Sequence, residues 1–307
     1  MDIISGSSIG SFQDSVATIG FFDGVHRGHR FLLGQVKAAA RKRGIDSAVV
    51  TFPVHPRKVL NKSFQPELLS TADEKLALLE TTGVQHCIML PFTYELSLSS
   101  AYDFMKLLRE RFHIRTLVVG YDHQFGHNRT EKFEDYCHYG KELHIEVVCA
   151  KKYVEEGHTV SSSLIRRLLK EGKVEQANAF LGYAYSLSGI VVEGHRIGRE
   201  LGFPTANLTI DDVGKLVPAD GVYAAYVYMK KDRYAGMLNI GKRPTMDNGT
   251  DRTVEVHILN FSDDIYRQPL RMELLKYLRP ERKYEQVEEL VEQMKKDREE
   301  VALLIRV

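Results

Sequence analysis

The sequence predicts two domains of different architecture: an α/β domain with a parallel sheet, followed by a mainly β domain with a terminal helix. The chain has 307 residues, which is long for a single domain. Its first half alternates short apolar runs with amphipathic stretches, as strands and helices do in a parallel sheet. From about Tyr183, short β-branched or aromatic runs are separated by polar turns, which indicates an antiparallel barrel. We place the boundary near Gly182, giving domains 1–182 and 183–307.

In the first half, apolar runs and amphipathic segments follow one another in turn. The expected strands are Val16–Phe22, Ser47–Phe52, Cys87–Leu90, Thr116–Val119 and Ile145–Cys149. The expected helices are Arg27–Arg43, Thr71–Thr82, Ser100–Phe112 and a segment from Ser161 to Leu169. Ligands of such sheets bind beyond the carboxyl ends of the strands. We therefore expect a nucleotide site at that edge.

The second half contains short strands and one helix. The expected strands are Tyr185–Val192, Val222–Met229, Tyr234–Ile240, Val254–Leu259 and Leu270–Leu275. The helix begins at about Tyr284 and has its apolar side chains on one face, which is typical of a helix packed against a core.

The composition is that of a soluble globular protein, with 43% hydrophobic and 27% charged residues. The net charge of +1 gives no reason to expect a nucleic acid as the main partner. No apolar run approaches the length of a membrane span, and no export signal is visible at the start. The three cysteines, Cys87, Cys137 and Cys149, form no CxxC pair. We therefore expect a cytoplasmic protein with reduced thiols.

The segment from Gly20 to Arg30 is the first candidate site. It reads Gly-Phe-Phe-Asp-Gly-Val-His-Arg-Gly-His-Arg and leads from an expected strand into an expected helix. Glycines let the backbone approach a ligand closely, and the free N–H groups of a helix start bind phosphate. His26 and His29 can both face a triphosphate and stabilise charge while an oxygen attacks the α-phosphorus and pyrophosphate leaves. A single histidine is more often structural, but the strand–glycine–helix context favours this functional interpretation.

A second glycine-rich segment has glycines at every fourth position, Gly194, Gly198 and Gly202, and continues as Phe-Pro-Thr-Ala-Asn. This pattern fits a loop over phosphates, with Thr205 and Asn207 as oxygen ligands of Mg²⁺. A turn-rich surface loop is an equal alternative when the segment is considered by itself.

The first candidate site resembles the His-x-Gly-His signature of the nucleotidyltransferase superfamily. The longer stretch is similar to the FMN adenylyltransferase domain of bacterial bifunctional riboflavin kinase/FAD synthetases. Three further segments resemble that family: Thr-Phe-Pro-Val-His-Pro at 51–56, Val-Gly-Tyr-Asp-His-Gln-Phe-Gly at 119–126 and Ser-Ser-Ser-Leu-Ile-Arg at 161–166. The chain departs from the family pattern at Phe21, where Asn is usual, and at His123, where Phe is usual. The flavin and adenine contacts at these two positions therefore stay open.

This resemblance implies a Rossmann-like domain with a defined set of site residues. His26, His29 and Arg166 are implied to be catalytic. The residues implied to bind the nucleotide are Gly20, Phe22, Asp23, Gly28, Asp122, Ser161 and Ser162. The serines and Arg166 have a physical rationale, since hydroxyls at a helix start and an arginine one turn later can hold an anion.

Residues 187–304 resemble the riboflavin kinase domain, with matching segments at 198–207, 218–224, 239–245, 255–257 and 277–281. The resemblance implies a six-stranded barrel in which Thr205 and Asn207 bind Mg²⁺ and the ATP phosphates. The implied nucleotide loop contains Gly194, Gly198 and Gly202. Glu255 is implied to be the base that takes the proton of the ribityl 5′-hydroxyl, which is reasonable chemistry for a carboxylate beside Mg·ATP. The local context alone favours an exposed strand carboxylate.

The favoured hypothesis is one enzyme with two ATP-using sites. The barrel converts riboflavin and ATP to FMN and ADP, and the N-terminal domain converts FMN and ATP to FAD and pyrophosphate, with Mg²⁺ at both sites. One alternative is a nucleotidyltransferase for another phosphate ester, but a mere substrate holder needs no Mg²⁺ ligands. The other is an inactive flavin-binding regulator, which the retained His26, His29 and Glu255 disfavour. Neither a nucleic acid nor a membrane is expected as a partner.

Overall fold

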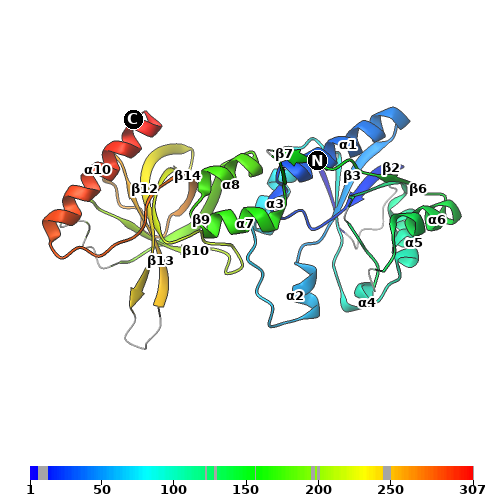
Figure 1. The fold of residues 1–307 in the computed structure, drawn as a ribbon, viewed down its shortest axis with the longest axis horizontal. Helices are drawn as coiled ribbons and strands as arrows, with labels where there is room; N and C mark the ends of the chain where they lie inside the picture. Colours follow the sequence, from blue (N-terminus) through cyan, green and yellow to red (C-terminus); the bar gives the residue numbers. More distant parts are fainter. Residues whose placement is uncertain are drawn as a thin grey trace. The chain divides into compact units, whose positions relative to one another are not determined.

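A computed structural model describes residues 1–5, 13–121, 123–127, 130–155, 157–194, 198, 201–244 and 250–306. The chain forms two compact units, Met1–Ser162 and Ser163–Val307. Each unit has its own sheet and its own core (Figure 1). The domain boundary near Gly182 marks a change in sequence pattern and stays a prediction.

The first unit contains a six-stranded sheet with the order β1-β4-β3-β2-β5-β6, and all neighbouring strands are parallel. The strands are β1 (Asp2–Ser5), β2 (Ser15–Ile19), β3 (Asp46–Thr51), β4 (His86–Met89), β5 (Ile114–Val119) and β6 (Glu146–Cys149). The predicted parallel sheet is confirmed. Strand β1 was not expected, because this short and largely exposed edge strand has no apolar run and exists through its pairing with β4. A two-stranded sheet, β7 (Val154–Glu155) and β8 (His158–Thr159), follows.

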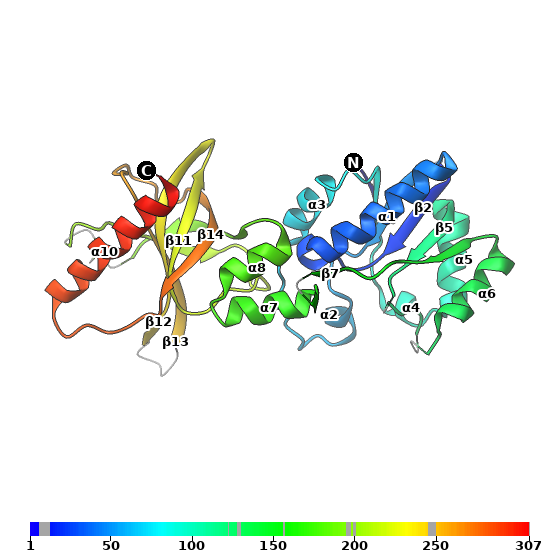
Figure 2. The ribbon, with the colours of Figure 1, turned by 45° about the horizontal axis from the view of Figure 1, so that its top comes forward.

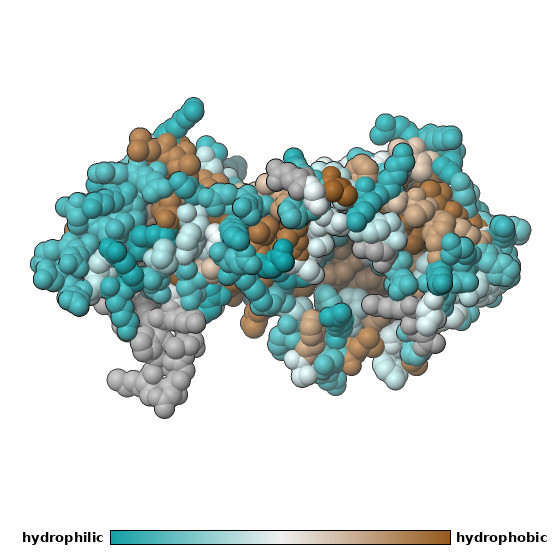
Figure 3. Space-filling model, viewed as in Figure 1, coloured by the Kyte–Doolittle hydropathy of each residue, from teal (hydrophilic) through white to brown (hydrophobic). Residues whose placement is uncertain are grey.

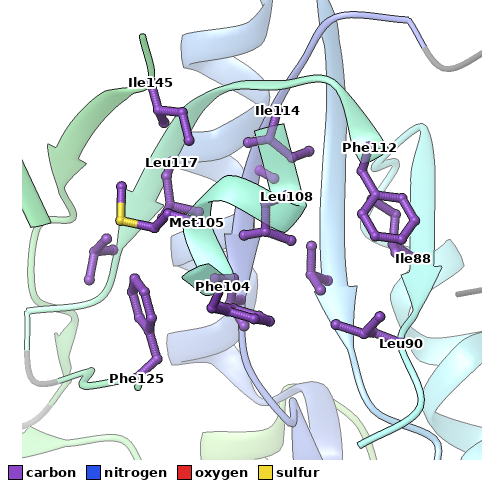
Figure 4. Close-up of a cluster of buried hydrophobic side chains, with 14 of the residues drawn as sticks. Ile88, Leu90, Phe104, Met105, Leu108, Phe112, Ile114, Leu117, Phe125 and Ile145 are labelled. Carbon is purple, nitrogen blue, oxygen red and sulfur yellow. The ribbon is translucent and has the colours of Figure 1, made fainter. Parts of the chain in front are cut away.

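Helices cover both faces of this sheet. The helices of the unit are α1 (Arg27–Arg43), α2 (Pro56–Leu60), α3 (Ala72–Glu80), α4 (Tyr94–Ser97), α5 (Ala101–Phe112) and α6 (Phe133–Leu143). Successive side chains of a strand point to opposite faces. In β3, Val49 packs in a cluster with residues of α1 and α3, whereas Ala48 and Val50 pack in the cluster that includes Met105 and Leu108 of α5. Figure 4 shows the α5 side of the core.

The second unit is a closed antiparallel barrel with the strand order β10-β13-β12-β11-β14-β9. The strands are β9 (Tyr185–Val192), β10 (Ala206–Ile210), β11 (Gly221–Met229), β12 (Asp232–Pro244), β13 (Thr250–Ile258) and β14 (Pro269–Arg279). The predicted six-stranded barrel is confirmed. Sequence periodicity missed β10, because this strand starts inside the Pro-Thr-Ala-Asn segment that resembles a loop.

Among the described residues, the second unit includes α7 (Ser162–Lys170), whose first residue belongs to the first unit, α8 (Val174–Leu181) and α10 (Val287–Ile305). Helix α10 lies across the outside of the barrel (Figure 2) and packs there through Val291, Met294 and Val301. Much of its exposed face is charged, and Figure 3 shows a mainly hydrophilic surface there with a hydrophobic patch near the C-terminal end of the helix, where Leu303 and Leu304 are exposed. In the part of the chain that the structure describes, no helix combines the length and the apolar character needed to cross a bilayer.

Candidate active sites

The histidines of the first unit follow a sharply bent turn between β2 and α1. Phe22, Gly24 and Val25 have φ angles of 55°, 75° and 34°. Positive φ is unfavourable for residues other than glycine, especially for a β-branched one. The surrounding structure must therefore hold this turn.

Asp23 is the main anchor of the turn. Its buried carboxylate accepts hydrogen bonds from the backbone N–H groups of Leu69 at 2.9 Å and Ser70 at 3.0 Å. The Gly24 N–H donates to Ser70 Oγ at 3.0 Å. The Ser162 hydroxyl donates to the Asp23 carbonyl at 3.0 Å. The turn is thus fixed to two segments that lie far away in the sequence.

His26 is the N-cap of α1, and its Nδ1 accepts the N–H of His29 at 3.3 Å. An accepting Nδ1 leaves the ring proton of a neutral imidazole on Nε2, so that Nε2–H is a donor. The two imidazole rings stack with centroids 3.6 Å apart, and the edge of Phe22 packs on His29 at 5.0 Å. Burial, with the charge of His26 as a second cause, holds the pKa of His29 well below its ordinary value. His29 is therefore neutral at pH 7.

A cavity of about 210 Å³ opens beside the two histidines. Gly120 and Ala150, which directly follow β5 and β6, line it, so it lies at the carboxyl edge where the sequence predicts a nucleotide. Gly28 is close-packed, since a Cβ there would lie 3.1 Å from the Val160 carbonyl oxygen. The predicted residues that line the cavity are His26, Gly28, His29, Ser161 and Ser162. It is also lined by Tyr121, from the family-like segment 119–126, and by Lys151 and Tyr153, which lie after β6 in a segment without a recognisable motif.

The other predicted residues that the structure describes do not line this cavity. Phe22 is buried in the core and Asp23 anchors the turn, so neither is among the residues that line the cavity. Gly20 follows β2 and donates its N–H to Val50 at 3.0 Å. Asp122 lies outside the described residues. Arg166 is a half-buried residue of α7 in the second unit, and its part in adenylyl transfer stays a prediction.

In the barrel, Glu255 belongs to a row of side chains that crosses five strands. Asn207 of β10 is paired with Glu255 of β13, which is paired with Asn239 of β12. Asn239 is paired with Val222 of β11, which is paired with Arg279 of β14. Directly paired residues of antiparallel strands project from the same face. The five side chains therefore share one face of the barrel.

A cavity of about 260 Å³ lies between this row and α10, and we call it the row cavity. Its barrel side includes Asn239 and Glu255, and its helix side includes Met294 and Asp297. Asp297 is buried and pairs with Arg279, whose Nη2 lies 2.8 Å from Oδ2. Because the two partners come from β14 and α10, this ion pair fixes the helix beside the cavity.

A second cavity of about 290 Å³, the loop cavity, is lined by Val191, Ala206, Val256, Ile258 and the loop residues 261–266. Thr205 lines both cavities. Its hydroxyl donates to the Glu255 carboxylate at 3.3 Å. The structure thus brings the predicted Thr205 and Glu255 together at the border of the two cavities. The loop 261–266 could not be recognised from the sequence, because no motif marks it.

The glycines of the second motif bring the chain close to this border. A Cβ on Gly194 would overlap the amide of Asn207, and one on Gly198 would overlap the carbonyl oxygen of Phe203. Gly202 has a φ of 80°, which favours glycine. Gly194 and Gly198 are required because the chain approaches another segment closely, and Gly202 because of its backbone conformation. A plain surface loop would not impose these requirements.

His257, two residues beyond Glu255, supports the same segment. Its Nδ1 donates to the Pro204 carbonyl at 2.8 Å, and its ring packs edge-on against Phe203. Burial lowers the pKa of His257, so the neutral ring with its proton on Nδ1 suits this bond. His257 therefore positions the residues that precede Thr205.

Comparison with known proteins agrees with the predicted family in both halves of the chain. A family model described as FAD synthetase matches residues 9–164, and one described as riboflavin kinase matches residues 181–305. The bifunctional riboflavin kinase/FMN adenylyltransferase of Listeria monocytogenes is 34% identical over 288 residues, which cover 94% of this chain and 91% of the relative. The proteins of the same name from Bacillus subtilis and Escherichia coli are 32% and 33% identical, each with 93% of this chain and 91% of the relative covered. The chain belongs to this family.

Membership in the bifunctional riboflavin kinase/FMN adenylyltransferase family confirms the predicted family, enzyme class and pair of activities. A crystal structure from Streptococcus pneumoniae, described as a macrolide-efflux protein, superposes with a TM-score of 0.89 at 31% identity and covers 97% of this chain and 98% of its own. The activity named in that description is stated of the Streptococcus protein and is not transferred to this chain. The likeness extends through both units.

Proposed function

We propose that the two cavities of the barrel bind the two substrates of riboflavin phosphorylation. Riboflavin occupies the row cavity, between the polar row and α10, and the adenosine of ATP occupies the loop cavity. The observation that carries this assignment is that Thr205 borders both cavities and bonds to Glu255. The γ-phosphate and the ribityl 5′-hydroxyl then meet beside a carboxylate.

Glu255 accepts the proton of the 5′-hydroxyl while the alcohol oxygen attacks the γ-phosphorus and ADP leaves. The oxygen donors of Thr205, Asn207 and Glu255 are the hard ligands that Mg²⁺ prefers. No cluster of three or more His, Cys, Asp or Glu that could hold a metal is found among the described residues. This suits Mg²⁺, which binds through few protein groups together with substrate phosphates. When bound, the metal neutralises phosphate charge.

In the first unit, the cavity beside the histidines holds the phosphates of ATP. An oxygen of the FMN phosphate attacks the α-phosphorus, and the bond to pyrophosphate breaks. His26 donates its Nε2–H to a phosphate oxygen, and the neutral His29 adds a second polar group. Lys151 lines the same cavity and offers positive charge to the departing pyrophosphate. Arg166, from the helix after Ser161, is proposed as a further cation.

The assignment of the two barrel cavities can be tested with one variant in each. Asn239→Ala alters only the row cavity, and Ile265→Ala alters only the loop cavity. We expect Asn239→Ala to raise the KM for riboflavin about 5- to 10-fold, the effect of one lost hydrogen bond, and to leave the KM for ATP unchanged. Ile265→Ala should do the reverse through lost apolar contact. If Asn239→Ala instead raised the KM for ATP, and Ile265→Ala raised the KM for riboflavin, the assignment would be wrong.

The cellular location and the domain limits follow the same proposal. The three cysteines are unpaired thiols, which fits a reducing compartment supplied with ATP, and we propose the cytoplasm. We propose 1–182 and 183–307 as the sequence domains, because the riboflavin kinase model begins at residue 181.

A further inference from the structure

Lys75 of α3 is a buried lysine that neither proposed reaction uses. Its side chain is 2% exposed. The ammonium donates to the Phe52 carbonyl at 2.7 Å and lies over the Phe21 ring, 4.1 Å from the ring centroid. Burying a lysine is costly unless its charge is compensated. The position of this charge therefore needs an explanation.

The two partners of Lys75 belong to the two strand ends beside the first active site. Phe21 immediately precedes the positive-φ residues of the turn, and Phe52 follows β3. The Thr51 hydroxyl donates to the Phe21 carbonyl at 3.1 Å, and the Phe21 ring packs edge-on against His55 at 4.7 Å. Lys75 thus joins the turn that carries His26 to the segment 51–56.

Charged groups on neighbouring elements act on Lys75 as well. Burial lowers the pKa of Lys75 to about 8, while the negative charge of Asp23 in the turn opposes this shift. Burial also raises the pKa of the Cys87 thiol to about 11, so Cys87 is neutral where Lys75 titrates. At pH 7 the ammonium is charged and holds Phe21 by a cation–π contact, which the neutral amine cannot make.

We propose that Lys75 is a positioning residue for adenylyl transfer, which fixes the strained turn before His26 by holding Phe21 and Phe52 together. Asp23 anchors the turn from the side of residues 69–70, and Lys75 anchors it from the side of β3. A misplacement of about 1 Å in a catalytic group can cost about 100-fold in rate. This inference rests on the proposed role of His26.

The test replaces Lys75 by methionine, which has a similar length and no charge. We expect Lys75→Met to lower the kcat for FAD formation from FMN and ATP about 10- to 100-fold with little change in either KM. Riboflavin phosphorylation by the same molecules should be unchanged. The matched control is Lys37→Met, because Lys37 also donates to a backbone carbonyl, that of Thr82 in the turn after α3. Its FAD formation should stay within about twofold of wild type.

A pH profile separates positioning from plain stability. Wild-type FAD formation should fall as pH rises through about 8, where the ammonium loses its proton, and this step should be missing in Lys75→Met. Phe21→Leu removes the aromatic face but keeps the lysine, so the step should move to lower pH. This second variant keeps the inference testable if Lys75→Met does not fold.

The possible outcomes are distinct. Wild-type kcat in Lys75→Met, an equal loss in Lys37→Met, or an unchanged pH step in Phe21→Leu would each overturn the role of Lys75. Failure of the proposed function would look different: His26→Ala would then form FAD as fast as wild type, whatever Lys75→Met does.

Discussion

The two active sites of this protein are built in opposite ways. In the first unit, both histidines come from one short segment at the start of α1, and their geometry follows from a single turn. In the barrel, the row around Glu255 is assembled from five strands that extend from Asn207 to Arg279. The first site depends on a local backbone conformation, and the second depends on strand register. A substitution should therefore disturb one site without the other.

The chemistry that we propose also differs between the two sites. Adenylyl transfer to a phosphate needs no base, because the attacking oxygen already carries charge, and we propose that His26 and the neutral His29 face the phosphates. Phosphorylation of an alcohol needs a proton acceptor, and we propose the Glu255 carboxylate of the barrel for this role. The proposed chemistry thus relies on hydrogen-bond donors in one unit and on a proton acceptor in the other.

The largest effect is expected for the double substitution of His26 and His29 by alanine. Each lost donor to a developing charge costs about 100- to 1,000-fold, so FAD formation should fall by about three orders of magnitude or more. FMN production should stay at the wild-type level. Flavin chromatography after incubation with riboflavin and Mg·ATP measures both. His138→Ala, at an exposed position of α6, is the control, and loss of both activities in a folded double variant would refute the two-site model.

The reverse separation is expected for Glu255→Gln. Loss of a general base costs about 100- to 10,000-fold, so riboflavin phosphorylation should nearly stop while supplied FMN is still adenylylated. The amide keeps the shape of the side chain, and Asn207 and Asn239 keep their strand partner. If Glu255→Gln phosphorylated riboflavin at the normal rate, the carboxylate would not be the base. Glu273→Gln, on β14 with a carboxylate bonded to Tyr228, is the control.

A smaller effect, confined to the barrel, is expected for Asp297→Ala. It removes one partner of a buried ion pair, which typically costs about 3 to 5 kcal/mol. We expect the unfolding midpoint of the second unit to fall and riboflavin binding to weaken, because α10 walls the row cavity. FMN adenylylation should persist below the new midpoint. The exposed Lys276–Glu300 pair provides the control, since Glu300→Ala should cost at most about 1 kcal/mol. Equal losses in both variants would contradict the structural role of Asp297.

The smallest expected effect is a loss of folding stability at acidic pH, which both units should show. His29 and His257 both have a folded-state pKa below the ordinary value of 6.5, so the unfolded chain binds more protons below that pH. The stabilisation is complete above pH 6.5 and is lost as the pH falls, by at most about 1.4 kcal/mol per pH unit for each histidine. Urea unfolding at pH 7.0 and 5.5 measures this loss. His29→Gln should flatten it in the first unit alone and His257→Gln in the second alone, and an unaltered slope in either would remove that histidine as the cause.

The sequence by itself determined the elements whose signals are local. Helix α1 begins and ends where its periodicity places it, at Arg27 and Arg43, and β9 matches its alternating run from Tyr185 to Val192. The histidine motif was visible for the same reason, because a strand end, glycines and a helix start lie within eleven residues. Short elements without such signals, such as β1 and β10, were missed.

The tertiary structure decided what depends on contacts between distant residues. Only strand register places Asn239 and Arg279 on the face that carries Glu255, and only loop packing brings residues 261–266 to Thr205. Phe22 and Asp23 lie inside the histidine motif, yet one is buried in the core and the other anchors the turn to Leu69 and Ser70. Local sequence encodes backbone conformation, whereas the use of a side chain depends on which distant groups fold against it.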